Sequence, residues 1–479
     1  MLDSSPRERT SRSRSRSGPF LRTSSGERDG ASRSYAHRRR RGRGSRHPSH
    51  RTSPRRGHDV ILIDDDEVKV RQAEQDLDAM VVHGNGASLA VLERAEASGA
   101  DAIIAVTNVD EINIVACVTG RTLGIPRRIA RVKDNDYFAH RSGRSMQRVG
   151  VDLMINPDLE AALEIERLVS LPGATDVTDF GDARVRMVGL YVDAKSEVLG
   201  LTLKELDRKY GPLPVTLVAI IRNGQTLIPD GDSTLQPEDH VFLIGESWLM
   251  PDVMGLIAQE VAPIKNVMII GAGPISRHLA RHLVDHKIHV KLVELNQAKA
   301  EMVAPELDKV LLLTGDGTDV ELLRSENVEA MDAFIAASND EETNIMSCLL
   351  ARHLGARKTI SVIRRSNYVP LVHVVGVDAA VSVRLSTATA VMTYFRKGEI
   401  LSFAQLKEND AEAVELLVTN KARAIKRTLN KLNIPRGAVV GAIIRGTQVI
   451  VPRGNSQVFE GDRVVVFALP EAIDEIQRI

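Results

Sequence analysis

Apolar residues in this chain fall into short continuous runs that are separated by segments with helical spacing. Between residues 267 and 363 the runs are VMII, VKLV, VLLLT, AFIAAS and TISVI. Between them lie segments such as DVELLRSENV and TNIMSCLLARHLG, in which apolar residues recur every three or four positions. Buried strands that alternate with helices predict a parallel sheet with both faces covered. We therefore expect a doubly wound, Rossmann-like α/β unit here.

The same pattern occurs about 230 residues earlier, so the chain contains an internal repeat. Three pairs of segments match: TNVDEINIVAC (107–117) with SNDEETNIMSC (338–348), HGNG (83–86) with TGDG (314–317), and HDVILID (58–64) with IHVKLVE (288–294). Cys117 and Cys348 occupy the same position of the repeat. We therefore predict a shared packing role for both cysteines.

A second kind of repeat follows each α/β unit. Residues 217–245 match residues 439–469, and both read as a strand, a turn, a strand, a Pro-centred turn and another strand. Such runs bounded by Gly, Pro and Asp predict small antiparallel α+β units. The predicted parts are a disordered segment (1–57), a truncated α/β unit (58–175), a small unit (176–262), a complete α/β unit (263–395) and a second small unit (396–479).

The first 57 residues differ from the rest of the chain. They contain 17 Arg, no Lys and four acidic residues, whereas the whole chain has no net charge. So few apolar residues cannot offset the entropy of ordering, and we predict disorder. We interpret the segment as not native to the fold, although an Arg-rich arm for nucleic acid or anionic lipid is the alternative. On either interpretation the first sheet lacks its central strand and its glycine turn.

Composition limits the class of protein. The 479 residues suffice for several domains, and aromatics make up only 3%, so the cores must consist of aliphatic side chains. We find no apolar run of 18 residues and no secretory signal, and the two distant cysteines suit a reduced, cytosolic chain.

A glycine turn in the second α/β unit is the main candidate site. The sequence VMIIGAGPIS gives a strand, a turn and a helix start, and Glu294 ends the next strand. Backbone N–H groups at a helix N-terminus favour a pyrophosphate, and an acid at the second strand end binds ribose hydroxyls. We assign an adenosine nucleotide to Gly271, Ala272, Gly273, Pro274, Ile275 and Glu294.

Further candidates follow the other strands, because ligands bind at the carboxyl ends of parallel strands. In the second unit they are Asp316, Gly317, Ser338 and Asn339. In the first unit they are Asp64, Thr107, Asn108 and Arg131, where Arg131 is either a phosphate contact or an exposed cation. We interpret the acid clusters SNDEETN and TNVDEIN as helix starts rather than metal sites, with Ser or Asn as the cap. His278 and His282 are assigned to a solvated helix face.

No proton-relay residue follows the glycine turn in a recognisable substrate domain. A nucleotide pocket without reacting groups indicates a switch, in which binding shifts a conformational equilibrium. We therefore expect a regulatory protein and not an enzyme.

The paired motifs and their order resemble the Trk-type potassium uptake regulatory subunits of bacteria, the TrkA family, with two tandem RCK units. The motifs are HDVILID, AVTNVDEINIVAC, RIARVKDNDY, VMIIGAGPISRHLA, TGDGTD, AASNDEETNIMSCLLA and both AIIR hairpins, and the likeness covers residues 58–479. Family members begin with a strand and a GAGxxG turn, and this chain departs from them there.

The resemblance implies binding of NAD⁺ or NADH, with ATP or ADP as further candidates. It also implies a cytoplasmic, peripheral protein that forms a homo-oligomeric, tetrameric ring and gates an integral-membrane potassium-translocating subunit. The alternatives are an NAD-dependent oxidoreductase, a regulator of another ion transporter, and a nucleic-acid-binding protein that acts through the Arg-rich arm.

Overall fold

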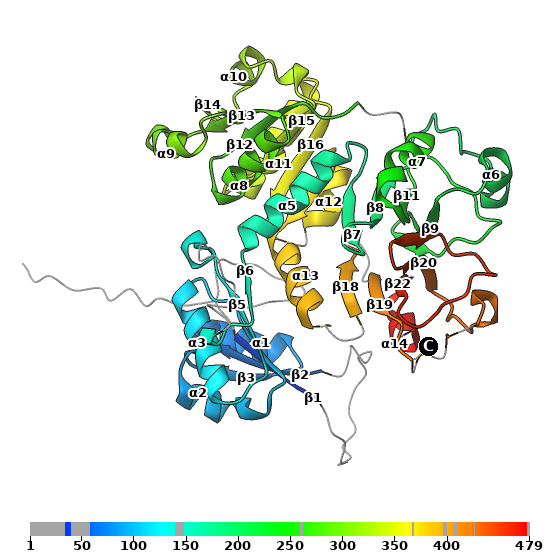
Figure 1. Cartoon of the computed structure of the whole chain (residues 1–479). Helices are drawn as coiled ribbons and strands as arrows, with labels where there is room; N and C mark the ends of the chain where they lie inside the picture. Colours follow the sequence, from blue (N-terminus) through cyan, green and yellow to red (C-terminus); the bar gives the residue numbers. More distant parts are fainter. Residues whose placement is uncertain are drawn as a thin grey trace, which may run out of the picture. The chain divides into compact units, whose positions relative to one another are not determined.

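The computed structural model describes residues 34–39, 58–138, 148–258, 262–365, 368–395, 400–406, 411–420, 422, 424–425 and 427–476. The chain divides into two compact units, Met1–Asn156 and Pro157–Ile479 (Figure 1). Each unit is described separately below. The predicted disorder of residues 1–33 and 40–57 lies outside the described residues.

The first unit is a six-stranded sheet with the strand order β3-β2-β1-β4-β5-β6. Five strands run parallel, as predicted, and the helices between them complete an α/β lobe. The strands are β2 (His58–Asp64), β3 (Met80–His83), β4 (Ala102–Ala105), β5 (Arg127–Arg131) and β6 (Leu153–Ile155), and the helices are α1 (Glu67–Asp76), α2 (Leu89–Arg94) and α3 (Asp110–Thr122).

The central strand of this sheet corrects a prediction. β1 (Ser34–Arg39) lies between β2 and β4 and runs antiparallel to both, so the first sheet does not lack a central strand and residues 34–39 are not disordered. Without it, the facing edges of β2 and β4 would leave backbone N–H and C=O groups unpaired inside the sheet. A parallel strand would need a crossover helix, which the Arg-, Ser- and Gly-rich sequence of residues 40–57 does not favour.

The second unit contains the complete α/β lobe, which we call the second N-lobe. Its six strands are all parallel in the order β14-β13-β12-β15-β16-β17, which matches the first sheet position for position. The strands are β12 (Asn266–Ile270), β13 (His289–Glu294), β14 (Leu311–Thr314), β15 (Ala333–Ala336), β16 (Lys358–Ile363) and β17 (Ala379–Ser382). The helices are α8 (Pro274–Asp285), α9 (Gln297–Val303), α10 (Val320–Ser325), α11 (Glu341–His353), α12 (Val369–Val374) and α13 (Val383–Phe395).

Two small antiparallel sheets complete the second unit and confirm the second repeat. Their orders, β10-β9-β11-β8-β7 and β21-β20-β22-β19-β18, are equivalent. The first C-lobe has β7 (Asp176–Phe180), β8 (Val185–Tyr191), α6 (Leu203–Tyr210), β9 (Val215–Arg222), β10 (Gln225–Leu227), β11 (His240–Glu246) and α7 (Met250–Ile257). The second has β18 (Ile400–Gln405), β19 (Glu412–Leu417), β20 (Ala438–Arg445), β21 (Gln448–Ile450), β22 (Arg463–Ala468) and α14 (Ile473–Ile476).

The two C-lobes share one apolar core. Phe180 and Ile244 from the first lobe pack with Ala442 and Phe467 from the second. A Cβ on Gly441 would lie 2.6 Å from Ile244 Cδ1, so a side chain there would push the sheets apart. The two C-lobes therefore form a single packed body rather than independent domains.

The predicted domain boundary at residue 175 placed helix α5 (Pro157–Ser170) in the first unit, but the structure places it elsewhere. It belongs to the second unit, where it lies along α8 and α13 (Figure 1). Its buried Ala161, Ile165 and Leu168 join the same core as the second N-lobe and the first C-lobe. The apolar face of α5 therefore packs in the core of the second unit, although the position of the helix in the sequence had suggested the first α/β unit.

The cysteines behave as the repeat predicted. Cys117 on α3 and Cys348 on α11 are both fully buried free thiols in apolar clusters. Burial raises the pKa of both thiols well above the ordinary value, so they remain protonated.

Candidate functional site

The glycine turn begins where β12 ends in the second N-lobe. Gly271 has φ +89°, and a Cβ there would lie 2.9 Å from the Cα of Ser338. Its N–H donates to the carbonyl oxygen of Val293 (2.7 Å), which ties the turn to the end of β13. Only glycine meets both conditions, because an L-residue is strained at this φ and has no space.

The second glycine has a different role. Gly273 is the N-cap residue of α8 and has an ordinary φ of −73°, and a Cβ there would meet nothing nearer than the Ala337 carbonyl oxygen at 3.7 Å. The fold therefore leaves space above Gly273. No side chain caps α8, so the N–H groups of its first turn are available to an anion at the positive end of the helix dipole.

The remaining turn residues contribute unequally. The N–H of Ala272 is used within the protein, and Pro274 has no N–H. The side chain of Ile275 is buried in the core, so only its backbone is suited to a phosphate. Ser276, at the third glycine position of the motif, is fully buried, and its hydroxyl oxygen has no hydrogen-bond partner among the described residues.

Glu294 organises the site from the end of β13. It is 6% exposed, and its Oε2 accepts hydrogen bonds from the Ala272 N–H (2.8 Å) and the Lys299 ammonium (2.6 Å), while Oε1 accepts from the Asn296 N–H (3.0 Å). Burial raises the pKa of Glu294, but these hydrogen bonds outweigh burial and leave the pKa below its ordinary value. The carboxylate is therefore ionised and oriented beside the turn.

The two residues predicted after β14 support the loop. Asp316 accepts hydrogen bonds from the N–H and the hydroxyl of Thr318 (2.8 and 2.7 Å), which lower its pKa. A Cβ on Gly317 would lie 2.3 Å from Ile270 Cγ2, so Gly317 allows the loop to pack against the end of β12. Both residues therefore determine the conformation of the loop after β14.

The residues after β15 are held by an asparagine that the sequence analysis missed. Asn344 accepts from the Ser338 N–H (2.9 Å) and donates to the carbonyl oxygens of Ser338 (3.2 Å) and Val362 (3.0 Å). Asn339 is exposed and accepts from Arg364 (2.7 Å). The internal repeat could have indicated this residue, because Asn344 has a repeat partner in Asn113.

The acid clusters begin helices, as predicted, but the cap residues differ. Asp340 caps α11 and accepts from the Thr343 N–H (2.7 Å), and Glu341 and Glu342 occupy the first turn. In the first unit Val109 is the cap residue of α3, without a side-chain hydrogen bond. The predicted Ser or Asn cap is therefore wrong in both copies.

In the first unit, the predicted candidates follow the corresponding strands but lack a glycine turn beside them. Asp64 is buried at the end of β2 and accepts from the Asp66 N–H (2.9 Å), and Asn108 is exposed after β4. Because β1 runs antiparallel, its first residue, Ser34, lies at this edge, opposite Ile63 and Ala105. The described residues therefore form no strand–turn–helix for a phosphate.

Arg131 turns back toward the protein. Its guanidinium donates to the Thr107 carbonyl oxygen (2.8 Å), and Asn113 donates to the same oxygen (2.9 Å) and to the carbonyl oxygen of Arg131 (2.8 Å). Thr107 is buried, and its hydroxyl donates to the Val109 carbonyl oxygen (2.8 Å) and accepts from the Val109 N–H (3.2 Å). Thr107 and Arg131 are thus brought together, and Arg131 stabilises a strand end.

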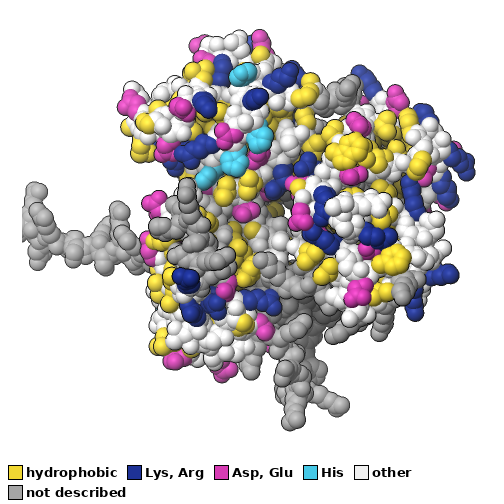
Figure 2. All heavy atoms as spheres, viewed as in Figure 1, with side chains coloured by type: hydrophobic (Ala, Val, Ile, Leu, Met, Phe, Trp, Pro, Cys, Tyr) yellow, Lys and Arg dark blue, Asp and Glu magenta, His cyan; other side chains and the backbone are white. Residues whose placement is uncertain are grey.

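The histidines of α8 are partly exposed, with the His282 side chain 40% exposed, so the predicted solvated helix face is correct only in part. His282 contacts Glu166 of α5 (Nδ1 to Oε2, 2.9 Å), and His278 is half-buried, so burial followed by the charge of Arg281 lowers its pKa. Figure 2 shows His side chains gathered on the visible surface. Among the residues that the structure describes, no group of three His, Cys, Asp or Glu is placed to hold a metal ion.

The second N-lobe thus combines an open glycine, a free helix N-terminus and an ionised carboxylate at adjacent strand ends. These features fit the pyrophosphate and ribose of an adenosine nucleotide. A nucleotide would be held by the backbone of Gly273 and Ile275 and by the carboxylate of Glu294. The first unit does not offer this combination within its described residues.

Comparisons with known proteins agree with this organisation. The TrkA-N domain family matches residues 51–157 and 267–383, and the TrkA-C domain family matches residues 187–250 and 413–479. The matched segments alternate along the chain, in the order that the repeats predicted.

One curated relative is the Trk system potassium uptake protein TrkA homolog 1 of Methanosarcina mazei, 36% identical over 429 residues, which cover 88% of this chain and 94% of the relative. The solved structure of the GsuK RCK domain has a TM-score of 0.53 at 18% identity and covers 87% of this chain and 88% of its own. The GsuK channel bound to NAD has a TM-score of 0.53 at 19% identity and covers 87% and 74%. These two structures share the fold.

The resemblance noted from the motifs is confirmed, and it leads to a transport-system family rather than an enzyme family. The chain belongs to the TrkA family of Trk system potassium uptake proteins.

Proposed function

We propose that this chain is a nucleotide-binding regulatory subunit that gates a membrane potassium-translocating subunit. A nucleotide binds at the glycine turn of the second N-lobe, and the occupancy of this site shifts the equilibrium between lobe arrangements. The observation that supports this most is the open backbone at Gly273 beside the ionised Glu294.

The proposed ligand is NAD⁺ or NADH, with ATP or ADP as further candidates. The GsuK channel has been solved bound to NAD, and this chain shares its fold. A carboxylate at the position of Glu294 suits unphosphorylated ribose and repels a 2′-phosphate. The adenosine half, which dinucleotides and adenine nucleotides have in common, therefore provides most of the recognition.

We further propose a homo-oligomeric, tetrameric ring that is peripheral at the cytoplasmic face of the membrane. Supporting this, the two α/β lobes expose apolar side chains at equivalent repeat positions, as an association face requires. The pairs are Met80 and Leu311 (49% and 51% exposed), Leu89 and Val320 (42% and 38%), and Val115 and Met346 (48% and 53%). Among the described residues, no helix has the length and apolar character needed to span a membrane.

Gly273→Ala tests the site directly. We expect the dissociation constant for NADH, measured by calorimetry, to rise at least about 10-fold, because the new methyl group occupies the path of the pyrophosphate. The melting temperature should change little, because the Cβ meets no atom closer than 3.7 Å within the protein.

Gly255→Ala is the matched control. Gly255 lies exposed on α7, with no atom within 4 Å of a Cβ, so this variant should bind like the parent. Unchanged affinity in Gly273→Ala would contradict the proposed phosphate position. An absence of heat with NAD⁺, NADH, ATP and ADP in the parent itself would contradict the proposed function.

Lys299→Met tests the carboxylate. Lys299 occupies one of the Glu294 oxygens that a ribose hydroxyl would use. The Lys299 side chain is about a third exposed, so the pair contributes at most about 1 kcal/mol. We expect a two- to five-fold gain in nucleotide affinity by calorimetry; a loss of affinity would show that Lys299 contacts the ligand instead.

A further inference from the structure

A cavity of about 340 Å³ lies at the sheet edge of the second N-lobe that is opposite to the proposed nucleotide site. Its lining includes Asp332, Lys358 and Asp378, which stand at the amino ends of three neighbouring strands, β15, β16 and β17. The glycine turn and Glu294, in contrast, follow the carboxyl ends of β12 and β13. Because all six strands are parallel, the length of the sheet separates the two places. We call this space the amino-end cavity.

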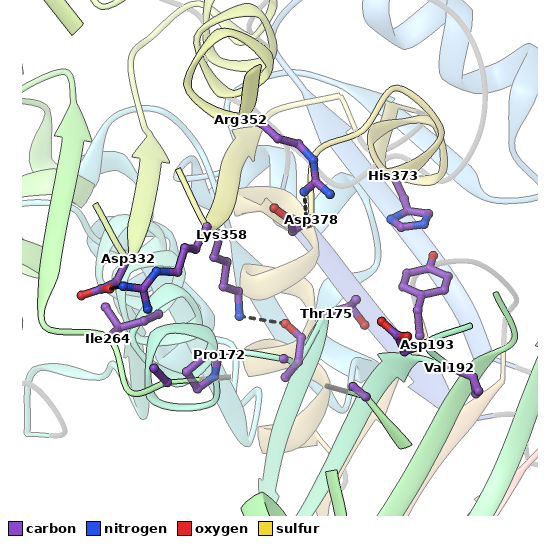
Figure 3. A pocket seen from close by; sticks show the side chains of 16 residues that line it. Pro172, Thr175, Val192, Asp193, Ile264, Asp332, Arg352, Lys358, His373 and Asp378 are labelled. Carbon is purple, nitrogen blue, oxygen red and sulfur yellow. Dashed lines mark hydrogen bonds and ion pairs between the residues drawn. The ribbon is translucent and has the colours of Figure 1, made fainter. Parts of the chain in front are cut away.

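The first C-lobe and the hinge before it form the opposite wall of the amino-end cavity (Figure 3). α5 ends at Ser170, and the hinge, residues 171–175, connects it to β7. Tyr191 of β8 also lines the cavity, and its ring stacks on that of His373 from α12, with 3.8 Å between the ring centroids. The volume is at the lower end of the range for small-molecule sites. A molecule bound here would contact both lobes.

Two arginines line the cavity from the second N-lobe. Arg352, near the end of α11, pairs with Asp378, and Arg357, before β16, pairs with Asp332 (Nη2 to Oδ1, 2.9 Å). The two arginine side chains are 48% and 53% exposed. Neighbouring strands are about 4.8 Å apart and β16 lies between β15 and β17, so the two aspartates are at least about 10 Å apart. The two ion pairs therefore lie on different sides of the cavity.

The main chain already fixes both aspartates. Oδ2 of Asp378 accepts from the N–H and the hydroxyl of Thr359 (2.8 Å each). Oδ2 of Asp332 accepts from the N–H groups of Lys265 and Asn266 (2.8 and 2.9 Å). One oxygen of each carboxylate is left for its arginine, whereas a guanidinium has five N–H groups. Each arginine is therefore held in place by its aspartate and keeps donors for an anion.

The first unit shows that the α/β fold does not require this arrangement. At the repeat position of Thr359 it has Arg128, whose Nη2 and N–H hold the equivalent carboxylate, that of Asp152 (2.7 and 2.8 Å). The repeat partner of Arg357 is Pro126. The first unit thus fixes its aspartate with an arginine of the same strand region. The pair of arginines at the cavity is specific to the second N-lobe.

Lys358 lies between the two ion pairs and is 4% exposed (Figure 3). Its Nζ donates to three carbonyl oxygens at the end of α5 and in the hinge, those of Leu168 (2.7 Å), Leu171 (3.2 Å) and Ala174 (2.9 Å). An ammonium has three N–H groups, so the hinge uses all of them. Lys358 therefore holds the hinge beside the cavity, and the two arginines provide the contacts for a ligand.

The wall formed by the first C-lobe disfavours a further negative charge. Asp193 follows β8, and its Oδ1 accepts from the Lys195 N–H (2.7 Å), so an anion close to it would be repelled. Other lining residues of this side are apolar, among them Pro172, Val192 and Ile264. A suitable ligand therefore has an uncharged middle and directs its anionic groups toward the arginines.

We propose that the amino-end cavity binds a small organic anion with one anionic group at each end, one for Arg352 and one for Arg357. Carboxylate and phosphate share the required chemistry, because both accept two parallel N–H groups from a guanidinium. The bound anion holds the hinge of the first C-lobe against the second N-lobe. The proposal goes beyond the proposed nucleotide response, because this is a second site at the other edge of the sheet.

Calorimetry on the full chain without nucleotide tests the site. The probes are glutarate, with two carboxylates, and 3-phosphoglycerate, with a phosphate and a carboxylate. Butyrate, with one carboxylate, is the matched control ligand at the same ionic strength. We expect the better of the two probes to bind about 10-fold or more tightly than butyrate, the scale of one charged hydrogen bond. Equal affinities for all three, or no heat with any of them, would overturn the proposal.

Variants identify the contacts. Arg352→Gln and Arg357→Gln should each raise the dissociation constant of the better probe about 10-fold. Arg436→Gln, which removes an exposed arginine of the second C-lobe, should bind like the parent. Gly273→Ala should also bind like the parent, because the glycine turn lies at the other edge of the sheet. Unchanged affinity in both cavity variants, or an equal loss in either control variant, would contradict the proposed contacts.

Hydrogen exchange locates the ligand in the parent chain and so does not depend on the folding of a variant. The N–H groups of Ala174 and Thr175 donate to the carbonyl oxygens of Leu171 and Gly189. At ten times its dissociation constant, the better probe should slow exchange at these two amides about 10-fold. Peptides from β12 are the internal reference and should not change. Unprotected hinge amides in the presence of bound probe would overturn the proposal, whether or not nucleotides bind at the glycine turn.

Discussion

Glu294→Gln is expected to lower the affinity for NADH by about 10- to 100-fold, which corresponds to about one hydrogen bond to a charged acceptor. The variant keeps the volume of the side chain but removes the negative charge that orients it between Ala272 and Lys299. Potassium uptake in a strain that depends on this chain should fall in parallel. Calorimetry measures the affinity, and the uptake rate measures its consequence.

The matched control is Glu301→Gln, on the exposed side of α9, where the carboxylate contacts only Gln297 in the described residues. It should leave both affinity and uptake unchanged. If Glu294→Gln and Glu301→Gln behave alike in both measurements, Glu294 does not hold the ligand. If affinity falls while uptake persists, the site binds nucleotide without controlling transport.

Arg222→Met is expected to destabilise the second unit by about 3–5 kcal/mol, because it leaves a buried carboxylate without its charge partner. Arg222 binds Asp239 through two hydrogen bonds of 2.7 Å, and Asp239 is 2% exposed. The midpoint of urea unfolding, followed by circular dichroism, should fall accordingly.

The repeat provides an internal comparison for this prediction. Arg445 holds Asp462 with the same two-pronged geometry (2.9 Å for both bonds), but its side chain is 39% exposed against 25% for Arg222. Because Arg445 is more exposed, water can replace part of its interaction with Asp462. Arg445→Met should therefore lower the stability less than Arg222→Met. Arg208→Met, on the exposed side of α6, should change stability by less than about 0.5 kcal/mol. Equal losses for all three variants would refute the argument.

The candidate site in the second N-lobe could be located from sequence because its signals are local. A strand, a glycine turn, a helix and an acid at the next strand end follow one another within 29 residues, Asn266 to Glu294. What the sequence did not indicate was how the predicted side chains are used. Asp316 closes a turn, Arg131 caps a strand end, and Asn113 and Asn344 hold the loops on which other candidates lie.

By itself, the sequence determined the alternation of two α/β lobes with two small β-rich lobes. It did so because continuous apolar runs, glycine turns and their repetition are properties of neighbouring residues. Only the tertiary structure decided that β1 fills the first sheet in the antiparallel direction, that α5 belongs to the second unit and that Lys358 is buried at its end. These outcomes depend on which backbone groups and apolar faces remain unpaired after the lobes have formed, and no local pattern records that.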